Sequence, residues 1–431
     1  MPTLPPHILV PPPGPRSIEI ASRLAAVECP AFEARREARE ARASTPQSPI
    51  AYARAYGGNV EDADGNRYVD LVAGFGACIL GHSPPPVREA LAAQVDNMWL
   101  ALGDVYGTEA KAELCEALAM LHPTPGARVM LGSSGADAVT SALKTCALAT
   151  GKAGVVAFHG AYHGLSHGPL AACGLHPGFR DPFAGQLGEH VVFARYPLSD
   201  EDLAPSLAEV RDALGTGRIG AVLVEPVLGR GGCVVPPTGF LESLRRLAHG
   251  HGALLVADEI WTGLGRSGAL VRSLLETDPD VICLGKGLGA GFPVSACIGT
   301  EAAMRAWGDH GGTAIHTATH FGNPLACAAA LAVIRNLTGL PERARAAGEH
   351  LRDRVVARCG SNLEVRGVGL MIGIRHRRDP AWATRAARRL LASGYLVLTG
   401  DPTGATITLT PPLDIERQRL DDFVDVLSSI T

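Results

Sequence analysis

The stretch from residue 128 to residue 298 most constrains the fold, because short apolar runs alternate there with helix-like segments. The apolar runs lie at 129–131, 155–158, 191–193, 221–224, 253–257, 281–284 and 295–298. Helix-like segments separate several of them, at 137–150, 201–214 and 239–249. Continuous apolar strands with helices between them bury both faces of a sheet. The pattern therefore predicts an α/β domain whose mostly parallel sheet is flanked by helices.

The N-terminal residues follow a different pattern. Residues 1–16 contain seven prolines, which predicts an extended arm or a flexible tail in place of a regular helix. Residues 17–43 are rich in Ala, Glu and Arg and predict a helix that is interrupted near Pro30. The turn residues 64–66, Asp-Gly-Asn, predict a β-hairpin within 57–70.

The C-terminal residues mix long helices with short strands. Helices are predicted near 324–337, 341–358, 380–393 and 416–429, and strands near 363–366, 370–374 and 395–398. We therefore expect an N-terminal arm and segment over 1–75, a large domain over 76–323 and a smaller C-terminal α+β domain over 324–431.

The charged residues and the cysteines exclude several classes of protein. The 39 basic and 43 acidic residues leave a net charge of −4, which provides no general attraction to nucleic acid or to an anionic membrane. The ten cysteines include no C-x-x-C pair, so we expect small buried thiols and neither a disulfide framework nor a metal site. The chain has no signal-like start and no uncharged apolar run of ~18 residues. We expect a cytoplasmic protein.

Polar side chains follow several of the predicted strands. Glu225 and Asp258 each come directly after an apolar run, and Lys286 comes two residues after the next one. Tyr162 and His163 lie just beyond another run. Because ligands bind outside the carboxyl ends of parallel strands, we expect these side chains to share one crevice.

Lys286 and Asp258 are the residue types that pyridoxal phosphate requires. A partly desolvated lysine is an amine nucleophile that forms a Schiff base with a carbonyl. An ionised aspartate keeps a pyridine nitrogen protonated, which makes the ring an electron sink. The residues alone leave another interpretation open, in which Asp258 caps the following segment and Lys286 is a solvated loop lysine.

The residues Ser134-Gly135-Ala136-Asp137 lie between a predicted strand and a predicted helix. The S-x-x-D spacing is that of a capping box, and the free N–H groups of such a helix start attract an anion such as phosphate. The alternative is an ordinary capped helix without a ligand. The glycine-rich residues 285–291 match nucleotide-binding motifs only in part, which disfavours a nucleotide-binding protein.

Taken together, these residues resemble the class III (ω-type) aminotransferases, which are fold type I pyridoxal phosphate enzymes. The resemblance runs from about Asp62 to Leu413. The matching stretches are 64–70, 80–82, 134–139, 162–164, 225–227, 258–268, 285–289 and Thr319 with 322–326.

The resemblance implies that Lys286 carries pyridoxal 5′-phosphate as the internal aldimine, that Asp258 pairs with the pyridine nitrogen and that Tyr162 stacks on the ring. The other cofactor-binding residues that it implies are Ser134, Gly135, Ala136 and Glu225, and the backbone N–H groups of Gly135 and Ala136 would bind the phosphate. It also implies a homodimer in which Thr319 reaches the phosphate of the neighbouring subunit. We expect His163 to be a packed, hydrogen-bonded histidine.

Three positions depart from the family pattern. Trp261 stands where many members have a Gln that contacts the cofactor's hydroxyl, and Arg230 stands where many have Glu. Thr408 replaces the Arg that usually binds the substrate carboxylate. We expect Arg230 to bind an anionic group of the substrate, so that 2-oxoglutarate-dependent transamination is poor or absent. The alternative is that Arg230 points to solvent or pairs with a neighbouring acid.

The function expected from this pattern is transamination between a small-molecule amino donor and an acceptor, either a keto acid or an aldehyde, with Lys286 as the reactive amine. The same site also suits an amino-acid racemase, epimerase or aminomutase, in which the proton returns to the substrate. A third interpretation is a non-catalytic binding protein, which the presence of both Asp258 and Lys286 disfavours.

Overall fold

The computed structural model describes residues 2–103 and 105–431. They form two compact units. The large unit is Pro85–Glu342, and the small unit combines the residues up to Pro84 with Arg343–Thr431. These units differ from the three expected parts, because the N-terminal and C-terminal residues belong together and 324–342 stays with the large unit. The small unit is joined by strand pairing, since Val69 lies opposite Tyr395 in a parallel pair.

The large unit contains a seven-stranded sheet in the order β4-β10-β9-β8-β7-β5-β6. The strands are β4 (Arg128–Gly132), β5 (Gly154–Phe158), β6 (Val191–Ala194), β7 (Ile219–Val224), β8 (Leu254–Asp258), β9 (Val281–Leu284) and β10 (Ser295–Gly299). Strand β10 runs antiparallel to the other six strands, which are parallel to one another. Each of the seven predicted apolar runs is a strand, and the mostly parallel α/β sheet is confirmed.

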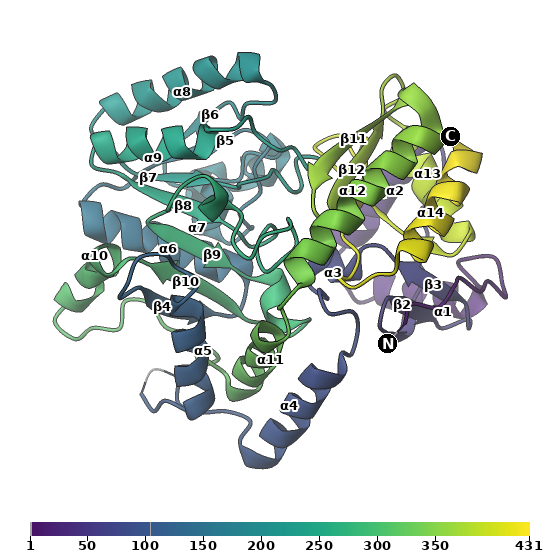
Figure 1. Ribbon diagram of the computed structural model, residues 1–431, viewed down its shortest axis with the longest axis horizontal. Helices are drawn as coiled ribbons and strands as arrows, with labels where there is room; N and C mark the ends of the chain where they lie inside the picture. The colour runs from purple at the N-terminus through teal and green to yellow at the C-terminus, as the bar shows by residue number, and fades with distance from the viewer. Residues whose placement is uncertain (1, 104) are drawn as a thin grey trace. The chain divides into compact units, whose positions relative to one another are not determined.

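Helices cover both faces of this sheet (Figure 1). The helices of the large unit are α4 (Pro85–Asn97), α5 (Glu109–Ala119), α6 (Gly135–Thr150), α7 (His167–Ala171), α8 (Asp200–Gly215), α9 (Phe240–Gly250), α10 (Glu301–Met304) and α11 (Pro324–Arg335). Alternate residues of β5 and β7 separate the two faces. Val155 and Leu223 pack with α6, whereas Val156 and Val224 pack with α8 and α9.

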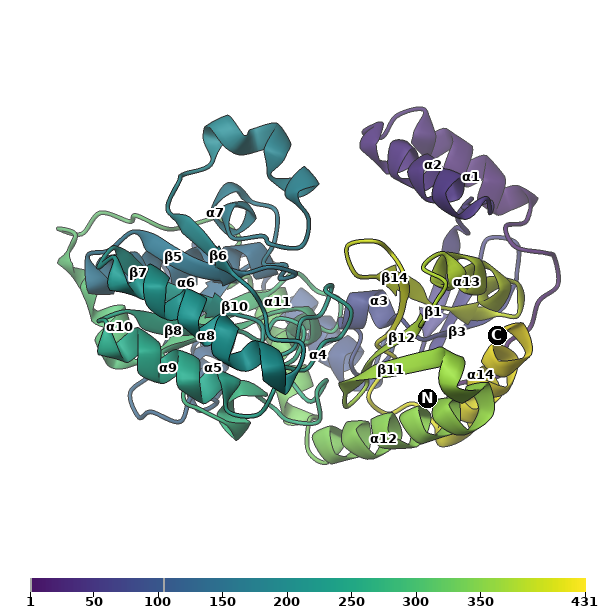
Figure 2. The ribbon, with the colours of Figure 1, turned by 90° about the horizontal axis from the view of Figure 1, so that it is seen from above.

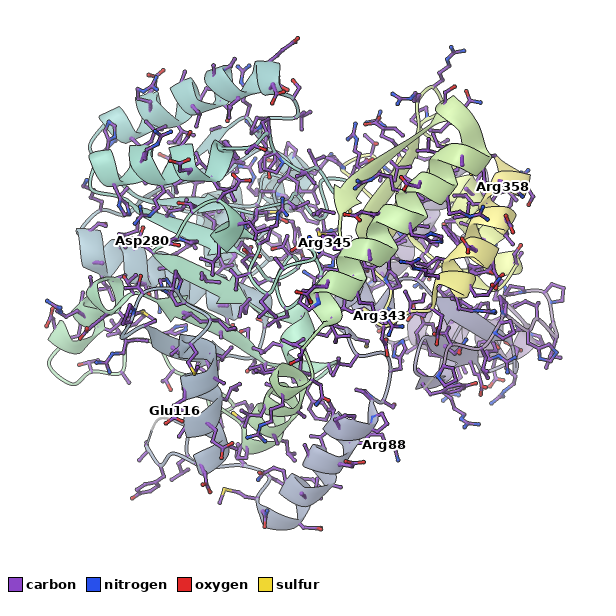
Figure 3. All side chains as sticks on the ribbon, in the orientation of Figure 1. Arg88, Glu116, Asp280, Arg343, Arg345 and Arg358 are labelled. Atoms are coloured by element: carbon purple, nitrogen blue, oxygen red, sulfur yellow. The ribbon has the colours of Figure 1, made fainter. Side chains whose placement is uncertain are left out.

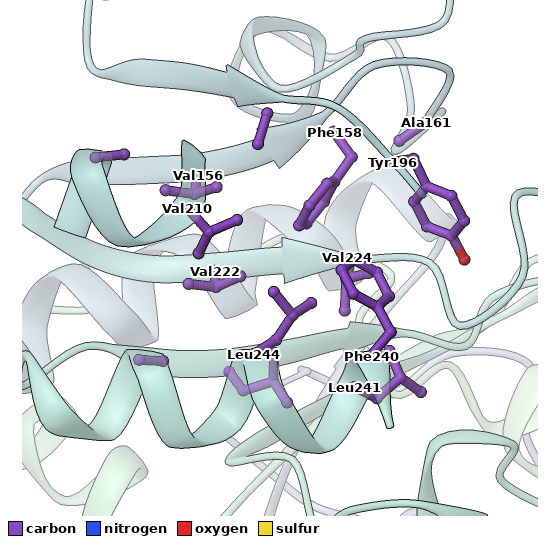
Figure 4. Close-up of a cluster of buried hydrophobic side chains, with 14 of the residues drawn as sticks. Val156, Phe158, Ala161, Tyr196, Val210, Val222, Val224, Phe240, Leu241 and Leu244 are labelled. Atoms are coloured by element: carbon purple, nitrogen blue, oxygen red, sulfur yellow. The ribbon is translucent and has the colours of Figure 1, made fainter. Parts of the chain in front are cut away.

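Three aromatic rings fill the core on the α8–α9 face (Figure 4). Phe158, Tyr196 and Phe240 pack edge to face, with ring centres 5.4 to 5.9 Å apart. The Tyr196 hydroxyl donates a 3.1 Å hydrogen bond to the carbonyl oxygen of Glu225. The apolar core therefore reaches directly to the carboxyl end of β7.

The small unit contains two four-stranded sheets, β1-β2-β3-β13 and β11-β12-β15-β14. Their strands are β1 (Tyr52–Tyr56), β2 (Asn59–Asp62), β3 (Arg67–Asp70), β11 (Leu363–Val368), β12 (Met371–His376), β13 (Tyr395–Leu396), β14 (Leu398–Gly400) and β15 (Thr406–Leu409). The helices are α1 (Pro15–Ala25), α2 (Ala31–Ala43), α3 (Ala73–Gly76), α12 (Leu340–Cys359), which starts at the end of the large unit, α13 (Trp382–Ala392) and α14 (Arg417–Ile430). Arg358 of α12, labelled in Figure 3, pairs with Asp425 of α14 at 3.1 Å.

The N-terminal arm is only partly as predicted. Residues 2–14 form no helix, and Asn66 Oδ1 accepts a hydrogen bond from the Leu9 N–H at 2.8 Å. The proline-rich stretch nevertheless starts helix α1 at Pro15, because a proline fits the first helical position. Figure 2 shows α1 and α2 in purple, and the break between them includes Pro30 as predicted. The predicted hairpin is β2–β3.

The cysteines are mostly buried, as predicted. Seven of the ten cysteines are buried and none forms a disulfide, but Cys29 is exposed, contrary to the expectation of buried thiols.

Within the described ranges, no single helix has the length and apolar composition to cross a membrane. Helix α11 and residues 340–362 meet both criteria only as a pair, which is bent by 70°. The same ranges hold no group of three or more His, Cys, Asp or Glu side chains placed to bind a metal.

Candidate active site

Three charged side chains lie at the carboxyl ends of three neighbouring strands. Glu225 follows β7, Asp258 ends β8 and Lys286 follows β9, and these strands are adjacent in the sheet. Asp258 and Glu225 are 4% and 5% exposed. Burial raises the pKa of Glu225 to about 7, although the nearby His163 opposes this, and the charge of Asp258 adds to the increase. The structure therefore brings these predicted residues together.

Lys286 occupies an unusual backbone position. Its φ is +32°, in the left-handed region that residues other than glycine rarely adopt. Such conformations cost free energy and concentrate at functional sites. Burial lowers the pKa of the Lys286 amine, although Asp258 and Glu225 oppose this effect. The amine Nζ lies 4.6 Å from the centre of the Trp261 ring, which does not fit the interpretation of Lys286 as a solvated loop lysine.

Asp258 is held from two sides. Its Oδ2 accepts a 2.7 Å hydrogen bond from His163 Nδ1, and its Oδ1 accepts one of 3.1 Å from the Ile260 N–H. The second bond is the capping contact considered from the sequence. The His163 side chain is fully buried, so the prediction of a packed, hydrogen-bonded histidine is confirmed. Its partner is Asp258 itself, which no sequence spacing indicated.

Glu225 connects two loops at the site. Its Oε1 accepts a 2.7 Å hydrogen bond from the Tyr162 N–H, and its Oε2 accepts one of 2.9 Å from the Gly229 N–H. Both carboxylate oxygens thus bind backbone of this chain. Glu225 therefore positions the Tyr162 loop and the loop that carries Arg230.

Arg230 packs on an aromatic pair. Its guanidinium carbon lies 4.3 Å from the centre of the Tyr162 ring and 5.6 Å from that of Phe179. The Tyr162 and Phe179 rings meet edge to face, with centres 6.1 Å apart. No carboxylate within residues 2–103 and 105–431 comes within ion-pair distance of Arg230, so the alternative of pairing with a neighbouring acid is not observed. No sequence pattern indicated Phe179.

The start of α6 is capped as predicted. The Ser134 hydroxyl accepts a 3.2 Å hydrogen bond from the Asp137 N–H, while Asp137 Oδ2 accepts one of 3.0 Å from the Ser133 N–H. A Cβ on Gly135 would lie 2.9 Å from Ile260 Cδ1, so a larger residue there would require the Ile260 side chain to shift. On the other side, Gly164 of the Tyr162 loop packs against Ala136. The helix start therefore lies against both loops.

Thr319 lies on an exposed loop before α11, and no described contact joins it to the residues above. The backbone of this loop approaches Gly103, whose Cβ position is 3.9 Å from the Thr319 carbonyl oxygen. Near Gly103 the chain exposes large apolar side chains, namely Met98, Trp99, Leu100, Leu102, Val105 and Tyr106. We call residues 98–106, apart from residue 104, the apolar segment.

Comparison with known proteins decides the family. The family model described as Aminotransferase class-III matches residues 40–431. An acetylornithine aminotransferase from Mycobacterium tuberculosis is 39% identical over 396 residues, which cover 89% of this chain and 92% of that protein. One from Methanothermobacter thermautotrophicus is 34% identical over 392 residues, covering 89% and 94%. The chain belongs to the class-III aminotransferase family.

Solved structures of this family agree with the fold. An amine transaminase from an uncultivated Pseudomonas species, in its PLP-bound internal aldimine form, is 30% identical with a TM-score of 0.83, over 89% of this chain and 95% of that one. The ornithine aminotransferase of Toxoplasma gondii is 27% identical with a TM-score of 0.81, over 95% and 97%. The chain is therefore a pyridoxal phosphate-dependent aminotransferase of fold type I. None of these proteins supports the racemase, epimerase or aminomutase alternative.

The residues of this aminotransferase fit the cofactor. Asp258 is buried and oriented by His163, the half-buried Lys286 lies near it, and Gly135 is the first residue of α6, where backbone N–H groups lack helical partners. The buried indole Nε1–H of Trp261 has no hydrogen-bond partner among the described residues, as expected where a ligand supplies the acceptor. Thr408, on β15 of the small unit, is buried and uncharged.

Proposed function

We propose that Lys286 is the residue that binds pyridoxal phosphate and transfers the proton during transamination. One observation carries this proposal, the strained and partly buried Lys286 after β9 beside the buried Asp258 at the end of β8. The lowered pKa of its amine increases the fraction of neutral Nζ, which is the form that attacks a carbonyl and accepts a proton.

The remaining residues position the reactants. Pyridoxal phosphate, when bound, supplies an electron sink that stabilises negative charge on the substrate carbon. Asp258, oriented by His163, holds a proton on the pyridine nitrogen. The Tyr162 ring provides a flat apolar face, and Glu225 fixes the backbone of Tyr162. Ser134 and the N–H groups of Gly135 and Ala136, at the positive end of α6, hold the phosphate.

Borohydride reduction followed by peptide mapping tests this assignment. In the wild-type protein we expect the cofactor to be fixed on Lys286. Lys286→Arg keeps the positive charge but forms no Schiff base, so we expect no covalent labelling of this variant. Labelling of another lysine in the wild-type protein would overturn the assignment.

We also propose that Arg230 binds a carboxylate of the substrate. The curated relatives are named acetylornithine aminotransferases and one solved neighbour is an ornithine aminotransferase, and the substrates in these names carry carboxylates. A guanidinium whose carbon lies 4.3 Å from the centre of the Tyr162 ring can still direct two N–H groups to a carboxylate. Thr408 supplies no positive charge in place of the family's arginine, so Arg230 is the anion-binding group that we assign.

Kinetics of Arg230→Ala with an acidic and an uncharged amino acceptor test this role. We expect kcat/KM for the acidic acceptor to fall by the equivalent of ~2–4 kcal/mol, while the uncharged acceptor changes little. Arg230→Lys, which keeps the charge but not the two-pronged geometry, should retain part of the activity. Unchanged kinetics with every acidic acceptor would show that the anion is bound elsewhere. In the wild-type protein, we expect 2-oxoglutarate to be a poor acceptor.

We propose that the active unit is a homodimer. The apolar segment is exposed and runs beside the Thr319 loop, and a second copy of the chain would cover it. Thr319→Ala should weaken cofactor retention more than stability, whereas Thr317→Ala, an exposed threonine of the same loop, should not. A fully active monomer in sedimentation at assay concentration would refute the dimer.

We further propose that the protein works in a reducing compartment, the cytoplasm. The support is the set of unpaired thiols, seven of them buried. Thiol titration of protein isolated under non-reducing alkylation should find all ten cysteines reduced. A native disulfide would contradict this proposal.

A further inference from the structure

Trp261 has two features, a lysine amine over its ring and a buried N–H group without a partner among the described residues. It lies in the turn after β8, three residues beyond Asp258, and is 9% exposed. Lys286 Nζ lies over its indole ring, 4.6 Å from the ring centre. Its Nε1–H is buried and has no hydrogen-bond partner within the described part of the chain.

Each feature has a physical consequence. The negative face of an indole attracts a cation, and this attraction is strongest when water is excluded. A buried N–H group without an acceptor is costly, so such a group is usually satisfied by something outside the chain or serves a function. Packing of the ring alone explains neither the Lys286 amine over its face nor the buried Nε1–H without an acceptor in the part of the chain that the structure describes.

We propose that Trp261 is a positioning residue for Lys286 and the cofactor: its ring face holds the Lys286 nitrogen, and its Nε1–H donates a hydrogen bond to the cofactor's ring oxygen. This inference rests on the proposed role of Lys286. In pyridoxal phosphate, the hydroxyl and aldehyde groups occupy adjacent ring carbons. The ring oxygen is therefore the acceptor closest to the carbon that Lys286 attacks, and a donor beside Lys286 is suitably placed to serve it.

The two contacts have opposite effects on the protonation of the lysine nitrogen. The ring face stabilises the positively charged nitrogen and raises its pKa. A hydrogen bond to the ring oxygen stabilises the negative charge there and competes with the bond between that oxygen and the protonated nitrogen, which lowers the same pKa. The other charged groups that act on Lys286 are Asp258, Glu225 and Arg230, and they are the same in every Trp261 variant.

Two variants of Trp261 distinguish the effect of the ring face from that of the Nε1–H group. Trp261→Phe keeps an aromatic face but loses the N–H, so the absorbance of the lysine-bound cofactor should titrate with a pKa higher than wild type by about 1. Trp261→Gln keeps an N–H donor but loses the ring, so the pKa should fall by about 0.5 to 1. Both pH titrations are read spectrophotometrically, without turnover.

The cofactor-free protein provides an independent measurement. The pH dependence of reductive methylation of Lys286, followed by mass spectrometry, reports the pKa of the free amine. We expect this pKa to be lower in Trp261→Gln and nearly that of wild type in Trp261→Phe. If Trp261→Gln fails to fold by circular dichroism, Trp261→Met replaces it as the variant without a ring.

The outcomes distinguish this inference from the assignment of Lys286. If the cofactor is fixed on Lys286 but both variants titrate like wild type, Trp261 only fills space and the inference is wrong. If Trp261→Phe alone titrates like wild type, the hydrogen bond is refuted. If the cofactor is found on another lysine, the proposed function fails, and the methylation experiment still decides whether the ring holds the Lys286 amine.

Discussion

The middle and the carboxyl end of the same strands in the large unit differ sharply. Midway along β5 and β7, residues such as Val156 and Val222 are fully buried among apolar side chains. At the carboxyl ends of β7, β8 and β9, charged groups are held beside one another, one of them on a strained backbone. The core consists of contacts that stabilise the fold, whereas the strand ends retain groups that burial destabilises.

This contrast shows where stability and reactivity are separated. Apolar packing contributes free energy in proportion to the area buried. A buried charge costs free energy unless it is paired, and that cost is the source of the altered pKa values of Lys286 and Glu225. Mutations in the two regions should therefore have opposite signatures, with the core affecting stability and the strand ends affecting activity.

The largest expected effect is at the reactive lysine. Lys286→Met should reduce transamination by at least ~10³-fold, because no other group replaces the amine. The same substitution should slightly stabilise the cofactor-free protein near neutral pH, since it removes an amine whose protonated form burial disfavours. Single-turnover amino transfer and thermal unfolding of the apoprotein measure the two effects. A large loss of stability would show that this strand end resembles the core after all.

The matching experiment in the core is Phe240→Ala. Phe240 is fully buried against Phe158 and Tyr196, so its truncation should lower the free energy of unfolding by ~3–5 kcal/mol. The kcat per folded molecule should remain that of wild type. Phe183→Ala, at a position 43% exposed in the same unit, serves as the control and should change stability by less than ~0.5 kcal/mol. Denaturant unfolding measures both, and a loss of kcat in Phe240→Ala would break the separation.

The pH dependence of stability probes the cost of the buried carboxylate. The pKa of Glu225 rises from 4.5 to about 7 on folding, so the folded protein binds this proton more tightly than the unfolded chain. The stability that results is fully present below pH ~4.5 and is lost as the pH rises to about 7, with a total change of up to ~3 kcal/mol.

Glu225→Gln should flatten this pH profile of the cofactor-free protein, because the amide does not titrate. Glu189→Gln, at an exposed position of the same unit, should leave the profile unchanged. Unfolding free energies measured from pH 4.5 to 7.5 make the comparison. A wild-type profile that rises over this range would mean that Glu225 is stabilised as a carboxylate.

The smallest expected effect compares two helix caps. Ser134 caps α6 at the site, and Thr108 caps α5 through a 3.2 Å hydrogen bond from the Lys111 N–H. Replacing either residue with Ala should cost ~1 kcal/mol of stability. Only Ser134→Ala should also weaken cofactor binding, as measured by the apparent Kd for pyridoxal phosphate. Equal cofactor affinities in the two variants would remove Ser134 from the phosphate site.

Local sequence patterns predicted the strands of the large sheet and some features of the small unit. The seven apolar runs, the cap at Ser134 and the break near Pro30 depend on side-chain periodicity and on residues a few positions apart. Strand β15 was not predicted, and α1 begins inside the proline-rich stretch. The two cases have different causes, because β15 pairs with β12, more than 30 residues earlier in the chain, whereas Pro15 meets the local requirements of a first helical residue.

The sequence by itself determined which residues end the strands and hence which chemical groups the site contains, because strand periodicity and turn residues act over short distances. Tertiary structure decided how those groups meet. Four contacts each join residues that are 25 or more positions apart: the pairing of β3 with β13, the hydrogen bond from His163 to Asp258, the contact of Arg230 with the Tyr162 ring and the position of Lys286 over Trp261. Contacts of this kind depend on the packing of whole elements, which no local pattern encodes.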